Sequence, residues 1–441
     1  MNIAIPVDLR IDPEWLIPVE PAAAVLRDHA LIVNQGRIVD LLPLAMAEQR
    51  YAAIEHQKLP GHALIPGLVN LHTHAAMTLL RGYADDRTLM DWLQNHIWPA
   101  EARWVSPEFV RDGSELACLE MLEGGITCFS DMYFFPGATL EAAKMAGQRV
   151  VGGLIVIDFA SAWASDADAY LQRGLELRDT WLDSATTHFA LAPHAPYSTS
   201  NRTLEKVALY ANQLEIPVHI HLHETQEEIR TSLQDHGVRP LARLDSLGLV
   251  NDQLIAVHAV HLQDSEIHLL AQRGAHVAHC PASNLKLASG ICPLASLAAA
   301  GVNIGIGTDG AASNNRLDML SEMCLAALLG KVGAAADVQA IPAAQALEMA
   351  TLGGARALGL DAQIGSLSPG KQADMVAIDL SQPTCQPCFD PVSTLVYAAG
   401  RESVRQVWVS GQQVVRDGMA TRLNSADILR RTRNWASRIK H

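Results

Sequence analysis

The chain has 441 residues, of which 49% are hydrophobic and 18% charged, a balance typical of a globular protein with a large buried core. Its formal net charge is -14 and its basic residues are scattered, which argues against a nucleic-acid or anionic-membrane surface. No apolar run approaches the ~20 residues of a membrane span, and the first residues do not resemble a secretory signal. We therefore expect a cytoplasmic protein that acts on a small molecule.

Short β-branched runs alternate with helical stretches from about residue 62 to 330. Ser106 reads as a helix N-cap with Pro107 at the first helical position, and Gly124 as the cap that ends this helix. Eight strand–helix repeats predict a parallel (β/α)8 barrel of the TIM type, an α/β fold whose chemistry collects at the C-terminal ends of the strands. The predicted strands are 63–74, 125–133, 148–157, 187–196, 217–224, 254–262, 274–281 and 301–310.

The two ends of the chain differ from this repeat. Short strands flank turns at Gln35-Gly36 and Ser410-Gly411, a pattern typical of hairpins. Because such segments lie on both sides of the barrel, we predict that they form one small β-sandwich, with two separate hairpin modules as the alternative. The predicted domains are this composite sandwich, from 1–62 and 366–441, and a catalytic barrel, 63–365.

Polar side chains that can bind a metal recur where the predicted barrel strands end. They are His72 and His74 on the first strand, His194 on the fourth, His221 on the fifth, His258 on the sixth and Asp309 on the eighth. A single histidine on an apolar strand is usually a packed core residue, but the ends of parallel strands meet at one mouth of a barrel. Three imidazoles and a carboxylate suit Zn2+, or another borderline divalent metal, with one position left open for water.

An ordered set of motifs carries a resemblance to a known family. The motifs are GLVNLHTH (67–74), HLHE (221–224), HAVHL (258–262), PASNLKL (281–287), GTDGAASNN (307–315) and SLSPGKQADMVAID (366–379). The chain resembles the amidohydrolase superfamily and, more closely, the 5-methylthioadenosine/S-adenosylhomocysteine deaminases, from about residue 30 to 420. The resemblance implies metal-dependent hydrolysis of such nucleosides, and of adenosine as a further substrate, to the inosine analogue and ammonia.

The stretch HIHLHET has three histidines that alternation places on one face of a strand. The family motif at this strand is His-x-x-Glu, so the resemblance places His221 on the metal and assigns the glutamate to Glu224. His219 and His223 would then be packing or supporting residues. Strict alternation would direct Glu224 away from the site, so we expect the strand to end near Leu222 and the chain to turn there.

The resemblance also assigns the catalytic roles. The metal set would be His72, His74, His221 and Asp309. A divalent ion lowers the pKa of bound water from ~15.7 to about 7. Glu224 would act as general acid and base on the purine ring, Asp309 would accept a proton from the water, and His258 would orient and polarise that water. The alternative for Glu224 is a solvated carboxylate at the start of a helix.

Barrels of the superfamily that the chain resembles often hold two metals bridged by a carboxylated lysine at the end of the fourth strand. The predicted fourth strand has no lysine, so the resemblance implies a single metal ion. We expect Zn2+ as this one divalent cofactor. His194 occupies the equivalent position and would contact the nucleoside, as would Glu224 and Asp309.

A long connection, residues 75–104, follows the first barrel strand, and loops of this length at a barrel mouth are typically lids. Its Trp92, Trp98 and Trp104 would wall an apolar slot or pack the lid against the barrel. Glu101 lies where the family carries a carboxylate for the ribose hydroxyls.

An ion pair of Glu101 with Arg103 or Arg81 is the competing account of that carboxylate. Some family members use arginines after the third strand to contact the nucleoside or its amino-acid tail, and the matching stretch GGLIVIDFASAWASDADAY has none. A small apolar 5′ group, as in methylthioadenosine, is therefore the preferred substituent.

Other signals are set aside or kept as alternatives. The G-x-G-x-x-G match at 305–310 comes at the eighth strand without the setting of a dinucleotide site. The seven cysteines, including the pair Cys385 and Cys388, are expected to be reduced thiols. Guanine or a chlorinated triazine remains an alternative substrate, and a non-catalytic scaffold is the alternative of another class. A homo-oligomer is left open, with no nucleic-acid or membrane partner expected.

Overall fold

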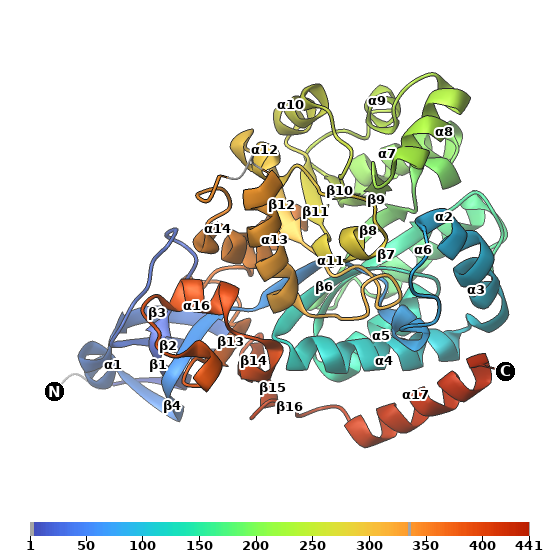
Figure 1. Ribbon diagram of the computed structural model, residues 1–441. Helices are drawn as coiled ribbons and strands as arrows, with labels where there is room; N and C mark the ends of the chain where they lie inside the picture. The colour runs from blue at the N-terminus through green and yellow to red at the C-terminus, as the bar shows by residue number, and fades with distance from the viewer. Residues whose placement is uncertain (1–3, 334–336, 441) are drawn as a thin grey trace.

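Parallel strands in chain order form the central barrel of the molecule (Figure 1). The computed structural model describes residues 4–333 and 337–440. Within this part of the chain, the barrel strands number eight, each hydrogen-bonded to the next. They are β5 (Leu68–Thr73), β6 (Ile126–Met132), β7 (Arg149–Val156), β8 (Thr187–Pro193), β9 (Val218–Leu222), β10 (Leu254–His258), β11 (His276–His279) and β12 (Asn303–Ile306). The predicted TIM-type barrel is confirmed.

The seam between the first and last strands is closed by side chains and by close backbone contact. Asn70 Nδ2 donates to Thr308 Oγ1 at 2.8 Å, and the Thr308 amide donates to Asn70 Oδ1 at 2.9 Å. The Asp309 amide donates to the His72 carbonyl at 2.9 Å. A Cβ at Gly307 would lie 2.8 Å from the His72 nitrogen, so only glycine allows this approach. The seam brings His72 and Asp309 together at one end of the barrel.

Helices cover the outside of the barrel and its mouth. α4 (Pro107–Glu123) begins after Ser106, whose hydroxyl accepts from the Phe109 amide at 3.2 Å, and ends at Gly124, as predicted. The others beyond the first strand are α5 (Pro136–Ala146), α6 (Ala167–Thr180), α7 (Asn201–Leu214), α8 (Gln226–His236), α9 (Pro240–Ser246), α10 (Asp264–Arg273), α11 (Pro281–Lys286), α12 (Leu294–Ala299), α13 (Met319–Gly333), α14 (Ala343–Glu348), α15 (Gly354–Ala357), α16 (Pro391–Tyr397) and α17 (Ser425–Lys440). None of the described helices combines the length and apolar character needed to cross a membrane.

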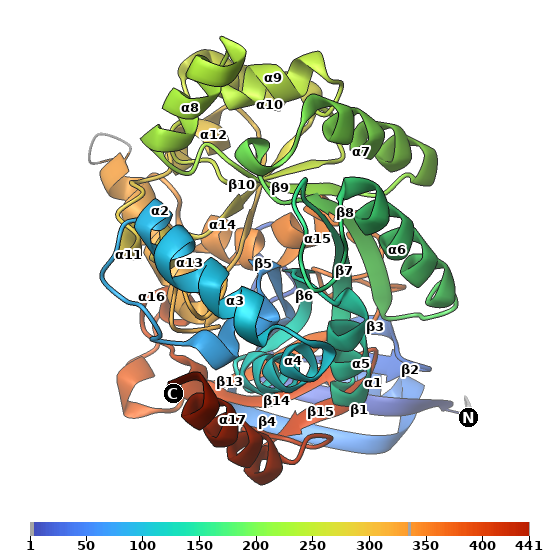
Figure 2. The same ribbon diagram turned by 90° about the vertical axis from the view of Figure 1, so that its right-hand side faces the viewer.

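The lid, residues 75–104, is helical for most of its length. It consists of η1 (Ala75–Leu80), α2 (Leu89–Trp92), η2 (Leu93–Ile97) and α3 (Trp98–Trp104). Figure 2 shows α2 and α3 lying in front of the barrel strands, and lid side chains line the same cavity as the strand ends.

The predicted strand 63–74 is wrong at its start, because the structure divides it into two. β4 (Tyr51–Pro66) continues to Pro66, which pairs with Met375 of the neighbouring β13, and β5 begins only at Leu68. Gly67 separates the two strands, and its amide donates to the Asp374 carbonyl at 2.9 Å. Residues 63–66 therefore belong to the sheet built by the termini.

Both ends of the chain together build one mixed sheet, separate from the barrel, so the prediction that the two termini form one composite β unit is confirmed. Its strand order is β16-β15-β14-β13-β4-β1-β2-β3, so C-terminal strands lie beside N-terminal ones (Figure 1). The further strands are β1 (Ile5–Leu16), β2 (His29–Asn34), β3 (Arg37–Pro43), β13 (Met375–Asp379), β14 (Val404–Val409), β15 (Gln412–Arg416) and β16 (Met419–Ala420), and α1 (Leu44–Arg50) precedes β4. The predicted domain limits, 62/63 and 365/366, remain a prediction.

Two tight hairpin turns form where the sequence predicts them. Gln35 and Gly36 have φ values of 50° and 76°, and Ser410 and Gly411 have φ values of 49° and 73°. Positive φ at both central residues is the geometry of a type I′ turn, which matches the twist of paired strands. The turns join β2 to β3 and β14 to β15.

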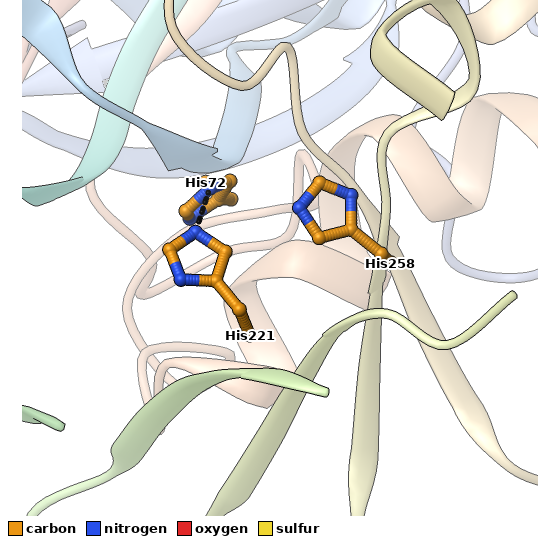
Figure 3. A group of neighbouring side chains, drawn as sticks. All are labelled: His72, His221 and His258. Atoms are coloured by element: carbon orange, nitrogen blue, oxygen red, sulfur yellow. Dashed lines mark hydrogen bonds between the residues drawn. The ribbon is translucent and has the colours of Figure 1, made fainter. Parts of the chain in front are cut away.

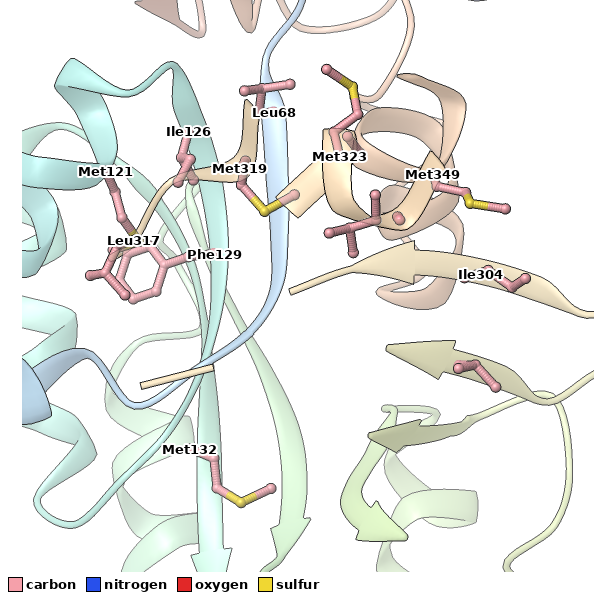
Figure 4. Packing of buried hydrophobic residues seen from close by; sticks show 14 of the residues in the cluster. Leu68, Met121, Ile126, Phe129, Met132, Ile304, Leu317, Met319, Met323 and Met349 are labelled. Atoms are coloured by element: carbon pink, nitrogen blue, oxygen red, sulfur yellow. The ribbon is translucent and has the colours of Figure 1, made fainter. Parts of the chain in front are cut away.

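A layer of buried apolar side chains surrounds the barrel strands (Figure 4). Leu68, Ile126, Phe129 and Ile304 come from barrel strands, and methionines from the surrounding segments lie around them: Met121, Met319, Met323 and Met349. Methionine adapts its shape to irregular gaps between elements. This packing holds the strands, and so determines where the polar residues at their ends lie.

A buried ion pair joins the barrel to the terminal sheet. Arg149 of β7 donates from Nε and Nη2 to the two carboxylate oxygens of Asp374 at 3.0 and 3.2 Å, and both side chains are 1% exposed. Arg149 Nη2 also donates to Ser410 Oγ at 3.0 Å. Burial lowers the pKa of Arg149, but the charge of Asp374 outweighs this and raises it, so the guanidinium keeps its charge.

Replacing Arg149 by methionine is expected to destabilise the protein by about 3–5 kcal/mol, because Asp374 would be left as an uncompensated buried charge. Urea denaturation followed by circular dichroism measures the change. The control is Arg230→Met, since Arg230 pairs with Glu227 at the surface, with side chains 66% and 53% exposed. That change should cost less than about 1 kcal/mol. Equal effects of the two substitutions would contradict the prediction.

Candidate metal centre and active site

Three histidines and an aspartate meet at the C-terminal mouth of the barrel. The Nε2 atoms of His72 and His74 lie 3.2 and 3.3 Å from Asp309 Oδ1. The Nε2 atoms of His72 and His221 lie 3.2 Å apart, and Figure 3 shows these two rings facing one another with His258 beside them. Ligand atoms ~2.1 Å from a tetrahedral ion are about 3.4 Å from one another. The possible ligand atoms form two groups that share His72, one with His74 and Asp309 and one with His221 and His258, and the separations within each group fit one cation.

The imidazoles are oriented through their other ring nitrogens. His221 Nδ1 donates to the His194 carbonyl at 2.7 Å, and His74 Nδ1 donates to the Met132 carbonyl at 2.5 Å. A histidine held in this way at Nδ1 presents the lone pair of Nε2, as a metal ligand must. Burial lowers the pKa of His221 well below its ordinary value, so the ring is neutral at pH 7.

His219 and His223 lie on either side of His221 along the chain and make different contacts. His219 Nε2 lies within hydrogen-bond distance of His72 Nδ1, at 2.9 Å, and this contact orients the His72 ring. His223 lies away from the group, where its Nε2 accepts from the Leu241 amide at 3.0 Å. Burial lowers the pKa of His72 to about 4, so the ring is neutral at pH 7.

Asp309 is held as a charged carboxylate. Ser283 Oγ and Ser313 Oγ both donate to its Oδ2 at 2.6 Å, and the Gly310 amide donates to its Oδ1 at 2.7 Å. Burial alone would raise its pKa, but hydrogen bonds from the neighbouring histidines lower it well below the ordinary value. For His74, burial is likewise outweighed by the bond to Asp309, and the pKa is raised to about 9. This point of the mouth favours a positive charge, so the donor set fits a divalent cation.

Glu224 is brought into the site by a turn at the end of β9. The strand ends at Leu222, and His223 has a φ of +56°, which confirms the predicted turn. Glu224 is 5% exposed, with its Oε2 3.8 Å from His258 Nε2. Burial raises its pKa, which favours a carboxyl able to hold a proton. His258 Nδ1 donates to Asn284 Oδ1 at 2.9 Å, and this leaves Nε2 facing the site.

A cavity of about 380 Å³ opens beside this group. Its walls are mostly apolar, and its polar lining includes Glu101, His194, Glu224, His258 and Asp309. Trp92 and Trp98 of the lid line it, as predicted for the apolar slot. Trp104 does not; it packs against the guanidinium groups of Arg103 and Arg438, 4.6 and 5.7 Å from the ring centre.

Glu101 faces the cavity from α3 and accepts a hydrogen bond from Tyr133 Oη at 2.7 Å. Burial raises its pKa to about 7, although the bond from Tyr133 lowers it. The competing ion pairs are not formed among the described residues. Arg81 pairs with Glu120, and Arg103 covers Trp104.

Several supporting residues were not identified from the sequence. They are Tyr133, which binds Glu101; Ser283 and Ser313, which bind Asp309; and Asn284, which binds His258. Ser283 and Asn284 lie within the motif PASNLKL, and Ser313 lies within GTDGAASNN. The motifs therefore include these residues but do not indicate which side chains they bind. Tyr133 follows β6 directly, and its position at a strand end was the one available signal.

Comparison with known proteins places this site in a family. The model of the amidohydrolase family matches residues 63–414. This chain belongs to the amidohydrolase family. The family is metal-dependent, which agrees with the donor set at the mouth of this amidohydrolase.

Relatives of this amidohydrolase match it over nearly its whole length. A 5-methylthioadenosine/S-adenosylhomocysteine deaminase of Teredinibacter turnerae is 48% identical, covering 98% of both chains. A crystal structure of an adenosine deaminase from Xanthomonas campestris with bound zinc is 50% identical, with a TM-score of 0.98 over 99% of this chain and 100% of that chain. Atrazine chlorohydrolase from Arthrobacter aurescens, 24% identical with a TM-score of 0.91 over 97% and 100% of the two chains, shares the fold.

Proposed function

We propose that this amidohydrolase hydrolytically deaminates 5′-methylthioadenosine, S-adenosylhomocysteine or both, with adenosine as a further substrate, to the inosine analogue and ammonia. The observation that carries the proposal is a buried carboxyl, Glu224, beside a group of histidines and Asp309 in an apolar cavity. Relatives that are 40–48% identical over nearly the full chain carry the name 5-methylthioadenosine/S-adenosylhomocysteine deaminase, which supports the same substrates.

One divalent ion, Zn2+, is the proposed cofactor. The residues that would hold it are His72, His74, His221 and Asp309, whose donor atoms approach one another within 3.2–3.3 Å in pairs. When bound, such an ion lowers the pKa of a water ligand from ~15.7 to about 7. The zinc in the Xanthomonas campestris structure supports the choice of metal.

The protein's own residues would move the protons of the reaction. Glu224 protonates the ring nitrogen next to C6 as the attacking oxygen adds to that carbon, and its raised pKa favours the protonated form that this step needs. Asp309, a carboxylate with a low pKa, accepts a proton from the attacking water. His258 orients that water through Nε2, because its Nδ1 is bound to Asn284. Asp309 then passes its proton to the C6 amino group, which leaves as ammonia, while Glu224 takes the proton of the new C6 hydroxyl as the carbonyl forms.

The nucleoside would fill the cavity between the mouth and the lid. His194 lines this cavity beside the metal set, with its Nδ1 bound to Ser198 Oγ at 3.0 Å, so its other nitrogen is available to the substrate. Glu101 would accept the ribose hydroxyls. Trp92 and Trp98 would cover the apolar part of the ligand.

Ammonia release by the purified protein tests the proposed function. Methylthioadenosine, S-adenosylhomocysteine and adenosine should each be assayed with guanine and a chlorotriazine as the alternative substrates. We expect turnover of at least one of the first three, accompanied by the ultraviolet shift of adenine to hypoxanthine. Turnover of guanine or the triazine alone would contradict the proposal. A protein that purifies without metal and turns over none of these compounds even after Zn2+ is added would favour the scaffold. Cytoplasmic location and the absence of nucleic-acid and membrane partners stay predictions.

Replacing Glu101 by glutamine is expected to lower kcat/KM for methylthioadenosine by about 10–100-fold, since hydrogen bonds to a charged group contribute about 1.5–3 kcal/mol. For a 2′,3′-dideoxy analogue, which lacks the ribose hydroxyls, the same substitution should change kcat/KM little. The pKa of Glu101 is about 7, so in the parent protein kcat/KM should fall as the pH drops below 7 and the carboxylate is protonated. That acid limb should be absent from the variant.

The matched control for this measurement is Glu108→Gln, a change at an exposed carboxylate in the first turn of α4. This substitution should leave kcat/KM unchanged for both methylthioadenosine and its dideoxy analogue. A Glu101 variant that loses equal activity toward the two nucleosides would show that Glu101 does not contact the ribose.

A further inference from the structure

The turn that carries Glu224 into the site is unusual in its backbone. β9 ends at Leu222, and the next residue, His223, has a φ of +56°. A bulky residue in this left-handed region is uncommon and persists where surrounding contacts impose it. The position of the Glu224 carboxyl therefore depends on what holds this turn.

Glu228, in the first turn of α8, binds both amides of the turn. Its Oε1 accepts from the His223 amide at 2.9 Å, and its Oε2 accepts from the Glu224 amide at 2.8 Å. The side chain is 6% exposed. Each oxygen has its own donor, so the carboxyl spans the two peptide groups.

This arrangement differs from an ordinary helix cap. Thr225 is the N-cap of α8, and its hydroxyl accepts from the Glu228 amide at 3.3 Å. In a capping box the glutamate at this position would bind the amide of the N-cap residue itself. Here the carboxyl group reaches past Thr225 to the amides of the two residues before it. The contact thus serves the turn before the helix in addition to the helix end.

The opposite side of the turn is held by backbone hydrogen bonds and by the buried His223 ring, whose Nε2 accepts from the Leu241 amide. The His223 carbonyl accepts from the amides of Val260 and His261 at 3.1 and 3.0 Å. By contrast, the Glu224 carboxyl itself has one described hydrogen bond, from Ser289 Oγ at 3.4 Å. Its place beside His258 is determined mainly by its backbone, and Glu228 is the group that binds that backbone amide.

We propose that Glu228 is a positioning residue, which holds the 223–224 peptide groups so that the Glu224 carboxyl faces the reacting ring. The inference rests on the proposed role of Glu224 in deamination. It assigns to Glu228 no contact with substrate and no part in metal binding.

The test compares Glu228→Ala with Glu227→Gln in the full-length, metal-loaded protein. Glu227 is the adjacent residue, 53% exposed and paired with Arg230, and its replacement should change nothing. Glu228→Ala is expected to lower kcat for methylthioadenosine by about 10²-fold, the cost of a displacement of roughly 1 Å in a catalytic group. KM and the metal content should be unchanged, so kcat and kcat/KM fall by the same factor.

Hydrogen–deuterium exchange gives a second readout that needs no turnover. The peptide covering 219–228 should exchange faster in Glu228→Ala than in the parent protein, because two buried amides lose their acceptor, and Glu227→Gln should match the parent. Should Glu228→Ala fail to fold, Glu228→Gln keeps the shape and one acceptor oxygen, and its kcat should fall below that of the parent protein, by less than about 10²-fold.

Parent-like kcat in Glu228→Ala, or a loss of kcat in proportion to lost metal, would overturn the proposal. If the parent protein deaminates none of the nucleosides, the proposed function fails, and unchanged exchange over 219–228 in the variant would separately overturn the positioning role.

Discussion

Replacing Glu224 by glutamine is expected to reduce kcat by ~10²–10⁴-fold, the usual contribution of a general acid and base. Glutamine keeps the shape of the side chain but cannot give up or take a proton at this site. The loss should be present at every pH, because the variant has no carboxyl to titrate. Steady-state ammonia release with methylthioadenosine measures it.

The metal content of Glu224→Gln should equal that of the parent protein, since Glu224 is outside the set of residues proposed to hold the ion. The matched control is Glu227→Gln. Glu227 is an exposed carboxylate in the first turn of α8, and its replacement should leave full activity. A Glu224 variant with more than half of the parent kcat would show that the ring is protonated by another group.

Loss of the metal is expected to have a comparably large effect. Replacing His221 by alanine removes one donor of the proposed set and should lower both metal occupancy and turnover, by more than the ~10–100-fold typical of residues that only support a ligand. Chelation of the parent protein should abolish turnover, because free water with a pKa of ~15.7 yields little hydroxide at neutral pH. Metal analysis and ammonia release are measured on the same samples.

An exposed histidine provides the control for this experiment. His268 lies on the outer face of α10, and His268→Ala should keep the parent's metal and activity. Added Zn2+ should restore the chelated parent protein but not His221→Ala. Full activity after complete chelation would exclude a metal from the reaction.

Much of the fold was predictable because its signals are local. The alternation of β-branched runs with helical stretches predicted the barrel, and Ser106 with Pro107 predicted where α4 begins. The pairs Gln35-Gly36 and Ser410-Gly411 predicted tight turns, since few residues accept a positive φ at such a position. These features depend on neighbours a few residues apart.

The sequence predicted which residues gather at the mouth of the barrel, but not the contacts that hold them there. Residues at the ends of parallel strands share one mouth, which is why separate histidines could be grouped. The need for a turn after Leu222 followed from strand alternation together with the role that the family resemblance assigns to Glu224, and the structure has this turn. What holds the turn, the carboxyl of Glu228 and the amides of Val260 and His261, could not be derived from alternation.

The sequence by itself determined the order of elements, the two hairpin turns and the residue types available at each strand end, because these are properties of short segments. Only the tertiary structure decided that β4 continues to Pro66, that Trp104 packs away from the cavity and that Tyr133 binds Glu101. The Nε2 atoms of His72 and His221 lie 3.2 Å apart although 149 residues separate them along the chain. Such a distance arises from the packing of the whole barrel, which no local preference of the backbone specifies.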